Sequence, residues 1–90
     1  AAVEYASSGV RINAIAPGSM WTPAFGTWLD QFPIGREGYE VQIPQGRMGR
    51  PDEIADAVLW LASDESSYVN GAVIPVDGGC WAKLASPTFE

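Results

Sequence analysis

A run of ten residues, Asn13-Ala-Ile-Ala-Pro-Gly-Ser-Met-Trp-Thr22, passes from an apolar strand pattern to a backbone break and then to polar groups. Pro17 has no N–H with which to continue a sheet ladder, and Gly18 allows another group to approach the backbone where a Cβ would block it. Thr22 offers a hydroxyl, and Pro23 favours an extended backbone at Thr22. These groups suit hydrogen bonding to a ligand beyond the end of a strand, although an ordinary loop exit after a buried strand has the same pattern.

Residues for nucleophilic or metal chemistry are scarce in the rest of the chain. The 90 residues include one cysteine and no histidine, which excludes Ser-His-Asp and Cys-His catalysis and histidine-based zinc sites. We therefore expect no metal, and we interpret Cys80 as a small packing residue. Arg47 and Arg50 could bind a phosphate, but Asp52 and Glu53 follow so closely that ion pairs at the surface are the better interpretation.

Composition and charge are those of an acidic globular chain. Hydrophobic residues make up 47% of the sequence, and 11 acidic against 5 basic residues give a net charge of −6. Such a chain repels nucleic acid phosphates and anionic membranes, so neither is expected as a partner. No apolar run approaches the roughly 20 residues that span a bilayer, and no signal peptide pattern is present, so we expect a cytoplasmic protein.

The elements that must position these residues begin with a helix and a strand. Residues 1–8 are rich in helix formers and Gly9 is a helix stop, whereas residues 10–16 alternate as a strand. Tyr5 is expected on a packed face, and Asn13 either binds a ligand or hydrogen-bonds the backbone of neighbouring loops. A helix, a glycine turn and a strand form half of a βαβ unit and favour an α/β fold.

The connection formed by residues 19–50 is too long for a plain loop in a compact domain, so we expect it to contain short helices. Apolar residues at i, i+3, i+4 and i+7 predict one stripe on a helix, formed by Phe25, Trp28, Leu29 and Phe32. After a break at Pro33 and Gly35, Tyr39 and Ile43 lie one helical turn apart. The two helices either form a lid over an apolar pocket or cap the core with their aromatic side chains.

The clearest helix is predicted at residues 51–63, because Pro51 suits the first helical position and acidic residues suit the first turn. Apolar residues at helical spacing predict one buried face, formed by Ile54, Ala57, Val58, Leu61 and Ala62. A short strand at residues 72–76 ends in an Asp-Gly-Gly turn, and Pro75 within it favours an edge strand that invites a second subunit. Trp81 and Phe89 predict that the segment 80–90 docks against the rest of the chain.

Five segments in this order and spacing resemble the C-terminal third of a classical short-chain dehydrogenase/reductase. They are Gly-Val-Arg-Ile-Asn-Ala-Ile-Ala-Pro-Gly (9–18), Thr-Pro (22–23), Gly-Arg-Met-Gly-Arg-Pro-Asp-Glu-Ile-Ala (46–55), Tyr-Val-Asn-Gly (68–71) and Val-Asp-Gly-Gly (76–79). The resemblance implies a doubly wound parallel sheet of the Rossmann type. Residues 1–79 would be its C-terminal portion, incomplete by itself, with a substrate loop at 19–50 and a tail at 80–90.

The resemblance also implies that NAD or NADP binds at the carboxyl ends of the strands. Pro17 and Gly18 would pass beside the nicotinamide, while the backbone of Met20 and the hydroxyl of Thr22 would hydrogen-bond its carboxamide. Met20 stands where the family often has Ile or Val, a departure of small consequence because the backbone makes the contact. The aromatic side chains of the substrate loop suggest a hydrophobic ketone or alcohol, cyclic or not; they are those of Trp21, Phe25, Trp28 and Phe32.

The implied protein is an oxidoreductase, a dimer or tetramer, that transfers a hydride between NAD(P) and a ketone or secondary alcohol. The family's glycine-rich loop, its Asn and Ser and its Tyr-x-x-x-Lys pair precede the matched segments, and neither Tyr5 nor Tyr68 has a lysine four residues later. We therefore assign no catalytic residue and expect the chain alone to be inactive, and also unstable because its strands lack neighbours. The alternative is a non-catalytic oligomerisation or interaction fragment.

Overall fold

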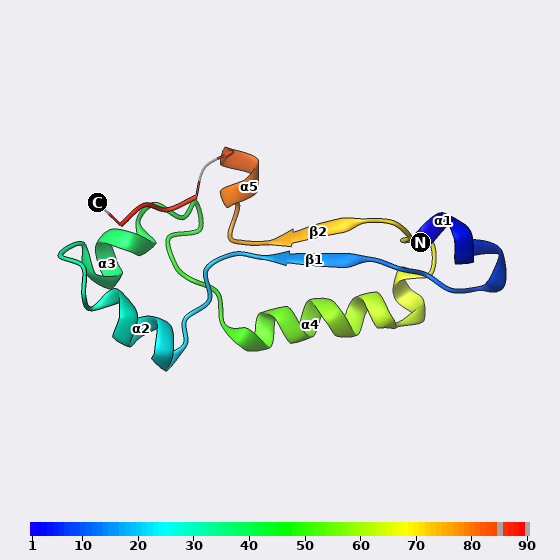
Figure 1. The fold of residues 1–90 in the computed structure, drawn as a ribbon, viewed down its shortest axis with the longest axis horizontal. Coiled ribbons are helices and arrows are strands. Elements are labelled where there is room, and N and C mark those ends of the chain that lie inside the picture. Colours follow the sequence, from blue (N-terminus) through cyan, green and yellow to red (C-terminus); the bar gives the residue numbers. More distant parts are fainter. Residues whose placement is uncertain (85, 90) are drawn as a thin grey trace.

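The computed structural model describes residues 1–84 and 86–89, and it is an elongated α/β arrangement about a two-stranded parallel sheet (Figure 1). Its elements are α1 (Ala2–Tyr5), a 3-10 turn (Ala6–Ser8), β1 (Ala14–Pro17), α2 (Pro23–Leu29), α3 (Gly35–Glu40), α4 (Pro51–Ala62), a second 3-10 turn (Asp64–Ser66), β2 (Val73–Val76) and α5 (Cys80–Lys83). The dimensions are 52 × 25 × 20 Å, and the radius of gyration is 16.1 Å. A compact domain of this length has a radius of gyration of about 12 Å, so the chain is markedly extended.

The two strands run in the same direction, with Ala14 opposite Val73 and Pro17 opposite Val76. The ladder is bounded by hydrogen bonds from the Ala14 N–H to the Ala72 C=O and from the Gly18 N–H to the Val76 C=O, both 2.9 Å. Because parallel strands use alternate residues, neither Pro17 nor Pro75 is required to donate between β1 and β2. Pro75 instead withholds a donor from the outer edge of β2, which fits the predicted edge strand.

Strand β1 is shorter than the predicted strand and begins later, since residues 10–13 do not pair with β2. The Asn13 amide replaces the ladder at this point: it donates to the Val69 C=O at 2.9 Å and accepts from the Ala72 N–H at 2.9 Å. The interpretation of Asn13 as a partner of loop backbone is therefore confirmed. Tyr5 is half exposed, so its predicted packing is wrong, because nothing in this part of the fold covers α1.

Helix α4 lies along one face of the sheet and begins at Pro51, as predicted (Figure 1). Ile54, Ala57 and Leu61 are half-buried, but Val58 is 50% exposed and no residue of the helix is fully buried. The predicted buried face is thus correct in direction and wrong in extent, because two strands are too narrow a surface to cover it. The opposite face of the sheet is open; its exposed residues are Ala14, Ala16, Val73 and Pro75.

The Arg11 side chain makes a set of hydrogen bonds that the sequence does not predict. Its guanidinium donates to the C=O groups of Leu61 (2.9 Å), Ser63 (3.1 Å) and Val69 (3.1 Å), and to the Ser66 hydroxyl at 3.2 Å. These carbonyls lie at the end of α4 and in the loop after it, where a helix leaves acceptors unsatisfied. Arg11 therefore ties the start of β1 to the end of α4.

The core lies away from the sheet, in the connection between β1 and α4. Leu29, Tyr39, Ile43 and Met48 are its buried hydrophobic residues. The two predicted short helices are present, but α2 ends at Leu29, before Phe32, and α3 ends at Glu40, before Ile43. We call residues 19–48 together with 86–89 the helical unit, and β1, β2 and α4 the sheet unit. Within the described residues, no helix has both the length and the apolar composition that crossing a membrane requires.

Candidate functional site

Both strands point toward the end of the molecule that carries α2, α3 and α5, so the carboxyl ends of β1 and β2 meet there (Figure 1). Directly after β1, Gly18 packs against Asp77 at the end of β2. A Cβ on Gly18 would lie 2.6 Å from the Cβ and 2.7 Å from the Cα of Asp77. The close approach that glycine allows here is therefore filled by Asp77 of the same chain, which is a structural reason for Gly18 that the sequence pattern does not reveal.

The backbone of Met20 is held in place, but its own N–H and C=O groups are left without hydrogen bonds to the described residues. Met20 forms a parallel bridge with Gly49, whose N–H donates to the Ser19 C=O at 3.0 Å and whose C=O accepts from the Trp21 N–H at 2.8 Å. Both bonds belong to the neighbours of Met20. Among the described residues, none is hydrogen-bonded to the N–H or to the C=O of Met20 itself. One donor and one acceptor are thus fixed side by side beyond the sheet.

Thr22 occupies the cap position at the start of α2. Its backbone is extended, with φ −133° and ψ 157°, as the following proline predicts, and its Oγ1 accepts from the Phe25 N–H at 3.1 Å. That bond fixes the side chain and leaves the hydroxyl hydrogen to be donated elsewhere, since it is paired with no acceptor in residues 1–84 or 86–89. Met20 and Thr22 together present two donors and one acceptor.

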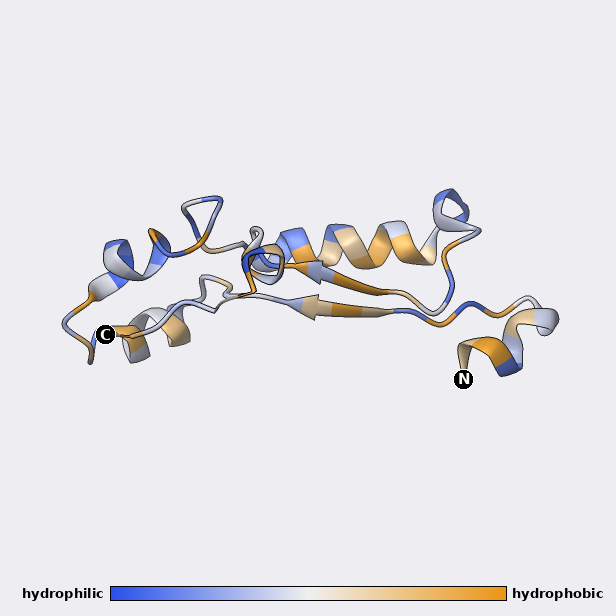
Figure 2. Ribbon diagram, turned by 90° about the horizontal axis from the view of Figure 1, so that it is seen from above, coloured by the Kyte–Doolittle hydropathy of each residue, from blue (hydrophilic) through white to orange (hydrophobic). Residues whose placement is uncertain are grey.

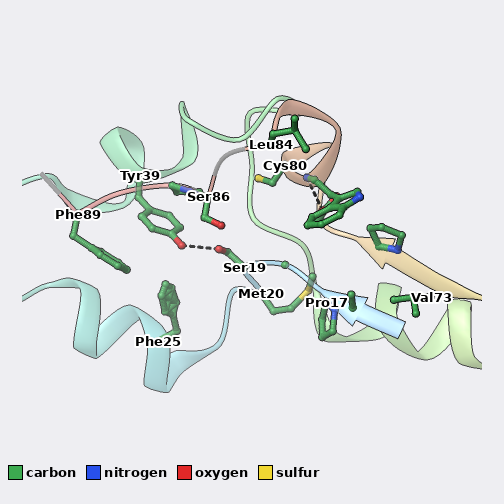
Figure 3. Close-up of a pocket in the computed structure, with 16 residues that line it drawn as sticks. Pro17, Ser19, Met20, Phe25, Tyr39, Val73, Cys80, Leu84, Ser86 and Phe89 are labelled. Carbon is green, nitrogen blue, oxygen red and sulfur yellow. Dashed lines mark hydrogen bonds between the residues drawn. The ribbon is translucent and has the colours of Figure 1, made fainter. Parts of the chain in front are cut away.

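An open hollow of about 850 Å³ lies beside this strand exit (Figure 3). Residues 16–20 form one side of it, and Tyr39, Phe25 and Phe89 form the end of it within the helical unit. The Ser19 and Tyr39 hydroxyls are 2.6 Å apart and hydrogen-bond each other in the hollow. The lining is mainly apolar, so this hydroxyl pair is a conspicuous polar point in it.

The four aromatic residues predicted for the substrate loop do not share one location. Phe25 lines the hollow, with its ring centroid 5.6 Å from that of Tyr39. Trp28 and Phe32 pack behind it against Phe89, at centroid distances of 4.9 and 5.1 Å. Trp21 does not line the hollow; it packs against the core of the helical unit, with the Arg36 guanidinium 3.8 Å above its ring.

Three residues of the hollow were missed by reasoning from the sequence. The sequence pattern does not single out Ser19 between Gly18 and Met20, although a hydroxyl next to a strand exit is a signal for a binding site. Tyr39 was predicted on a helix, but its hydrogen bond to Ser19 depends on how α3 folds back. Phe89 was predicted to dock, and this is confirmed; Trp81, of which the same was expected, is 69% exposed.

The two arginines before α4 form ion pairs, as expected. Arg47 holds Glu53 through two hydrogen bonds of 2.8 and 3.0 Å, and Arg50 lies 3.2 Å from Asp52. The hydrogen bond from Arg47, followed by that from the Arg50 backbone N–H, lowers the pKa of Glu53 from 4.5 to about 2. The same pair raises the pKa of Arg47.

A strand exit with free backbone groups at the carboxyl edge of a parallel sheet is the place where α/β proteins bind nucleotides. A family model described as enoyl-(acyl carrier protein) reductase matches residues 1–80. With the relatives and solved structures below, this match shows that the chain belongs to the short-chain dehydrogenase/reductase family. The predicted α/β fold of Rossmann type is confirmed by the same structures.

The chain is 49% identical over 78 residues to 3beta-hydroxysteroid dehydrogenase 1 of Eggerthella lenta, covering 87% of the chain and 30% of that protein. It is 48% identical over 79 residues to a 3-oxoacyl-acyl-carrier-protein reductase of Thermotoga maritima, with coverages of 87% and 30%. A solved structure, a putative 2-deoxy-d-gluconate 3-dehydrogenase from Agrobacterium tumefaciens with bound NADP, has a TM-score of 0.78 and 38% identity; the likeness covers 90% of this chain and 32% of that one. The chain thus spans about 30% of the length of the curated relatives it matches.

Proposed function

We propose that the chain is the C-terminal part of an NAD(P)-dependent oxidoreductase that acts on a ketone or secondary alcohol. Its own share of the work is to orient the nicotinamide and to cover the substrate. The observation that carries this proposal is the pair of unused backbone groups of Met20 beside the hydroxyl hydrogen of Thr22. A cytoplasmic location and a homo-oligomer are part of the proposal.

The residues at the strand exit fit a nicotinamide in their hydrogen-bonding capacity. A carboxamide has one carbonyl acceptor and an NH2 donor, and Met20 and Thr22 offer the complementary donors and acceptor. Pro17 and Gly18 line the hollow immediately before them. Either NAD or NADP has this carboxamide, so the site suits both cofactors.

When bound, the dinucleotide supplies or accepts the hydride at C4 of its nicotinamide ring. The residues of this chain make that transfer possible by positioning, because hydride transfer requires the ring carbon and the substrate carbonyl carbon to be held close and aligned. Phe25 and Tyr39 give an apolar end to the hollow in which the substrate carbonyl would lie. The proton for the carbonyl oxygen would come from the tyrosine of the Tyr-x-x-x-Lys pair, outside these 90 residues.

Complementation tests the proposal directly. The chain alone is expected to show no NAD(P)H-dependent ketone reduction. Added to, or fused with, an N-terminal part that carries the glycine-rich loop and the Tyr-x-x-x-Lys pair, it is expected to restore turnover. Turnover by the chain alone would contradict the predicted inactivity, and failure of every complementing partner would remove the enzyme proposal.

Thr22 tests the proposed contact with the cofactor in the completed enzyme. Thr22→Val removes the hydroxyl, so both its cap bond and its bond to the carboxamide are lost, whereas Thr22→Ser keeps both. We expect a Kd for NAD(P)H about tenfold higher in the valine variant, as for the loss of one hydrogen bond worth about 1.4 kcal/mol, and a near-normal Kd in the serine variant. Thr27→Val, which alters a hydroxyl on the outside of α2, is the matched control and is expected to leave the Kd unchanged.

The second candidate is a non-catalytic oligomerisation or interaction fragment. It is favoured by exposed apolar side chains on α4, Val58, Leu59 and Trp60, and by the outer edge of β2. The two functions differ in what they require. The enzyme needs a glycine-rich loop and a Tyr-x-x-x-Lys pair in the reading frame upstream of Ala1, while an interaction fragment needs neither and would bind its partner without NAD(P).

A further inference from the structure

Ser86, Pro87 and Phe89 line the hollow, and Thr88 between them is held by hydrogen bonds to Gln42. The Gln42 side chain donates to the Thr88 C=O at 2.7 Å, and its Oε1 accepts from the Thr88 N–H at 2.7 Å and from the Thr88 hydroxyl at 3.2 Å. The Lys83 ammonium donates to the Gln42 C=O at 3.1 Å, so the end of α5 is also bonded to Gln42. One side chain, that of Gln42, therefore satisfies both backbone groups of Thr88.

This fastening places Phe89 among the aromatic side chains of the helical unit. Its ring centroid lies 4.9 Å from Trp28, 5.1 Å from Phe32 and 5.2 Å from Tyr39, with the Tyr39 ring stacked at 25°. Phe89 and Phe25 both lie next to the Tyr39 ring at the end of the hollow (Figure 3). Aromatic contacts of this kind are favourable beyond the area they bury, so the ring is held and not merely placed.

We propose that residues 86–89 are the outer wall of the substrate pocket and that Phe89 is a specificity-determining residue, which favours apolar ketones and alcohols of ring size over small acyclic ones. The inference rests on the proposed function, and it adds to the pocket a segment that lies outside the substrate loop. A wall of aromatic faces gains most from a flat apolar substrate, because the gain is proportional to the apolar area removed from water. A small acyclic ketone removes less apolar area from water and gains less from such a wall.

The hydroxyl pair of Ser19 and Tyr39 gives the same pocket one polar point. The two hydroxyls share one hydrogen in their mutual bond, and the other hydrogen remains for donation. Phe89 stacks on the Tyr39 ring and so fixes where that hydrogen is presented. Substituting Phe89 is accordingly expected to act on substrate binding and not on the hydride step.

The test uses the completed enzyme with cyclohexanone and 2-butanone as probes. For Phe89→Ala we expect the KM for cyclohexanone to rise about tenfold, the KM for 2-butanone to change less than about twofold, and kcat to stay within about twofold. Phe89→Tyr, which keeps the ring, should restore the cyclohexanone KM. Gln42→Ala should act in the same direction as Phe89→Ala by unfastening Thr88. The matched controls are Gln31→Ala, at an exposed glutamine elsewhere in the helical unit, and Tyr68→Ala, at a fully exposed aromatic residue.

A second measurement follows the position of Phe89 and the binding of cyclohexanone without requiring turnover. In protein labelled with 5-fluorotryptophan, the Trp28 resonance should shift in Phe89→Ala and in Gln42→Ala, and cyclohexanone should bind the alanine variant at position 89 about tenfold more weakly. Equal KM changes for both ketones, or a Trp28 resonance that neither variant moves, would overturn the inference. If wild-type enzyme reduces no ketone at all, the proposed function fails, and the cyclohexanone titration alone then decides whether the wall exists.

Discussion

The helical unit buries apolar side chains in a core of its own, whereas the sheet unit leaves most of its apolar surface exposed. Among the residues that the structure describes, the four buried hydrophobic ones all belong to the helical unit, and Phe89 makes aromatic contacts with three residues on the outer side of that unit. In the sheet unit, α4 has no buried residue and both strands have exposed positions at every second residue. Figure 2 shows apolar colour along much of both strands and along part of α4.

This difference shows which half depends on neighbours. Parallel strands in α/β proteins are normally covered on both faces, and Ala14, Ala16, Val73 and Pro75 have the apolar composition for that but no cover. The helical unit depends less on such cover, because its apolar side chains pack against one another in the core. In the chain alone, we therefore expect the helical unit to be more stable against local unfolding than the sheet. We also expect the chain to aggregate through its exposed sheet.

The largest expected effect comes from a pair of leucine truncations, one in each unit. Leu29→Ala removes a side chain that is 1% exposed and should cost about 2–5 kcal/mol. Leu59→Ala, at a position 68% exposed on α4, should cost less than about 0.5 kcal/mol in the chain alone. Amide hydrogen exchange of the α2, α3 and α4 backbone measures both.

The same pair sharpens the contrast when it is repeated in the completed, oligomeric protein. If α4 is covered there by a second subunit, the cost of Leu59→Ala should rise toward that of Leu29→Ala. A cost that stays near zero would show that the exposed face of α4 is a free surface, and the expected oligomer would then need another interface.

Arg11→Ala should have the next largest effect, and it acts within the sheet unit. The guanidinium donates to three carbonyls and to Ser66, whose side chain is 1% exposed, so its removal leaves acceptors at the end of α4 unpaired. We expect a loss of about 2–3 kcal/mol, measured by urea unfolding of the completed protein. Arg50→Ala, which breaks only exposed ion pairs, is the control, with an expected loss below about 1 kcal/mol. Equal losses in the two variants would mean that Arg11 is only a surface charge.

The elements of both units could be predicted from local patterns, but only for α4 could the ends be predicted as well. Pro51 and the apolar repeat of α4 are local signals and gave the helix to within a residue at its C-terminus. The start of β1 depends instead on Asn13 bonding to residues 69 and 72, more than 50 positions away in the sequence. The early ends of α2 and α3 likewise follow from packing around Leu29 and Tyr39, which propensity does not contain.

The site divides in the same way. The strand exit with Met20 and Thr22 can be singled out from the sequence because it is one contiguous segment, and its proposed role comes from the resemblance to the family. The hollow is instead assembled from Ser19, Tyr39 and Phe89, which are 70 residues apart at the extremes. No pattern in the sequence brings these three together. The role of Gly18 was readable only in part, since the group that requires its missing Cβ is Asp77.

Gly18→Ala tests the junction between the two units. The added Cβ would meet the backbone of Asp77, which cannot move without shifting the end of β2, so we expect a loss of about 1–3 kcal/mol and weaker NAD(P)H binding. Gly9→Ala is a useful comparison, because φ is +79° there and nothing lies within 4 Å of the added Cβ. Only left-handed strain of about 1 kcal/mol is expected at Gly9, with the Kd for NAD(P)H unchanged. If both variants weaken cofactor binding equally, the effect is one of global stability and not of the strand exit.

The smallest expected effect is the pH dependence of the Glu53–Arg47 pair at the start of α4. The pKa of Glu53 is lowered from 4.5 to about 2, so the stabilisation by this carboxylate is fully present above pH 4.5 and is lost as the pH falls toward 2. Arg47→Gln should raise the pKa of Glu53 back toward 4.5, which NMR titration of the Glu53 side chain measures. The Arg50 backbone N–H still donates to Glu53 at 2.9 Å in this variant, so the recovery should be incomplete. Because the pair lies on the surface, its loss should leave the hydrogen-exchange protection of α2 and α3 unchanged. Reduced protection of these helices at pH 3 would show that the two units unfold together and not separately.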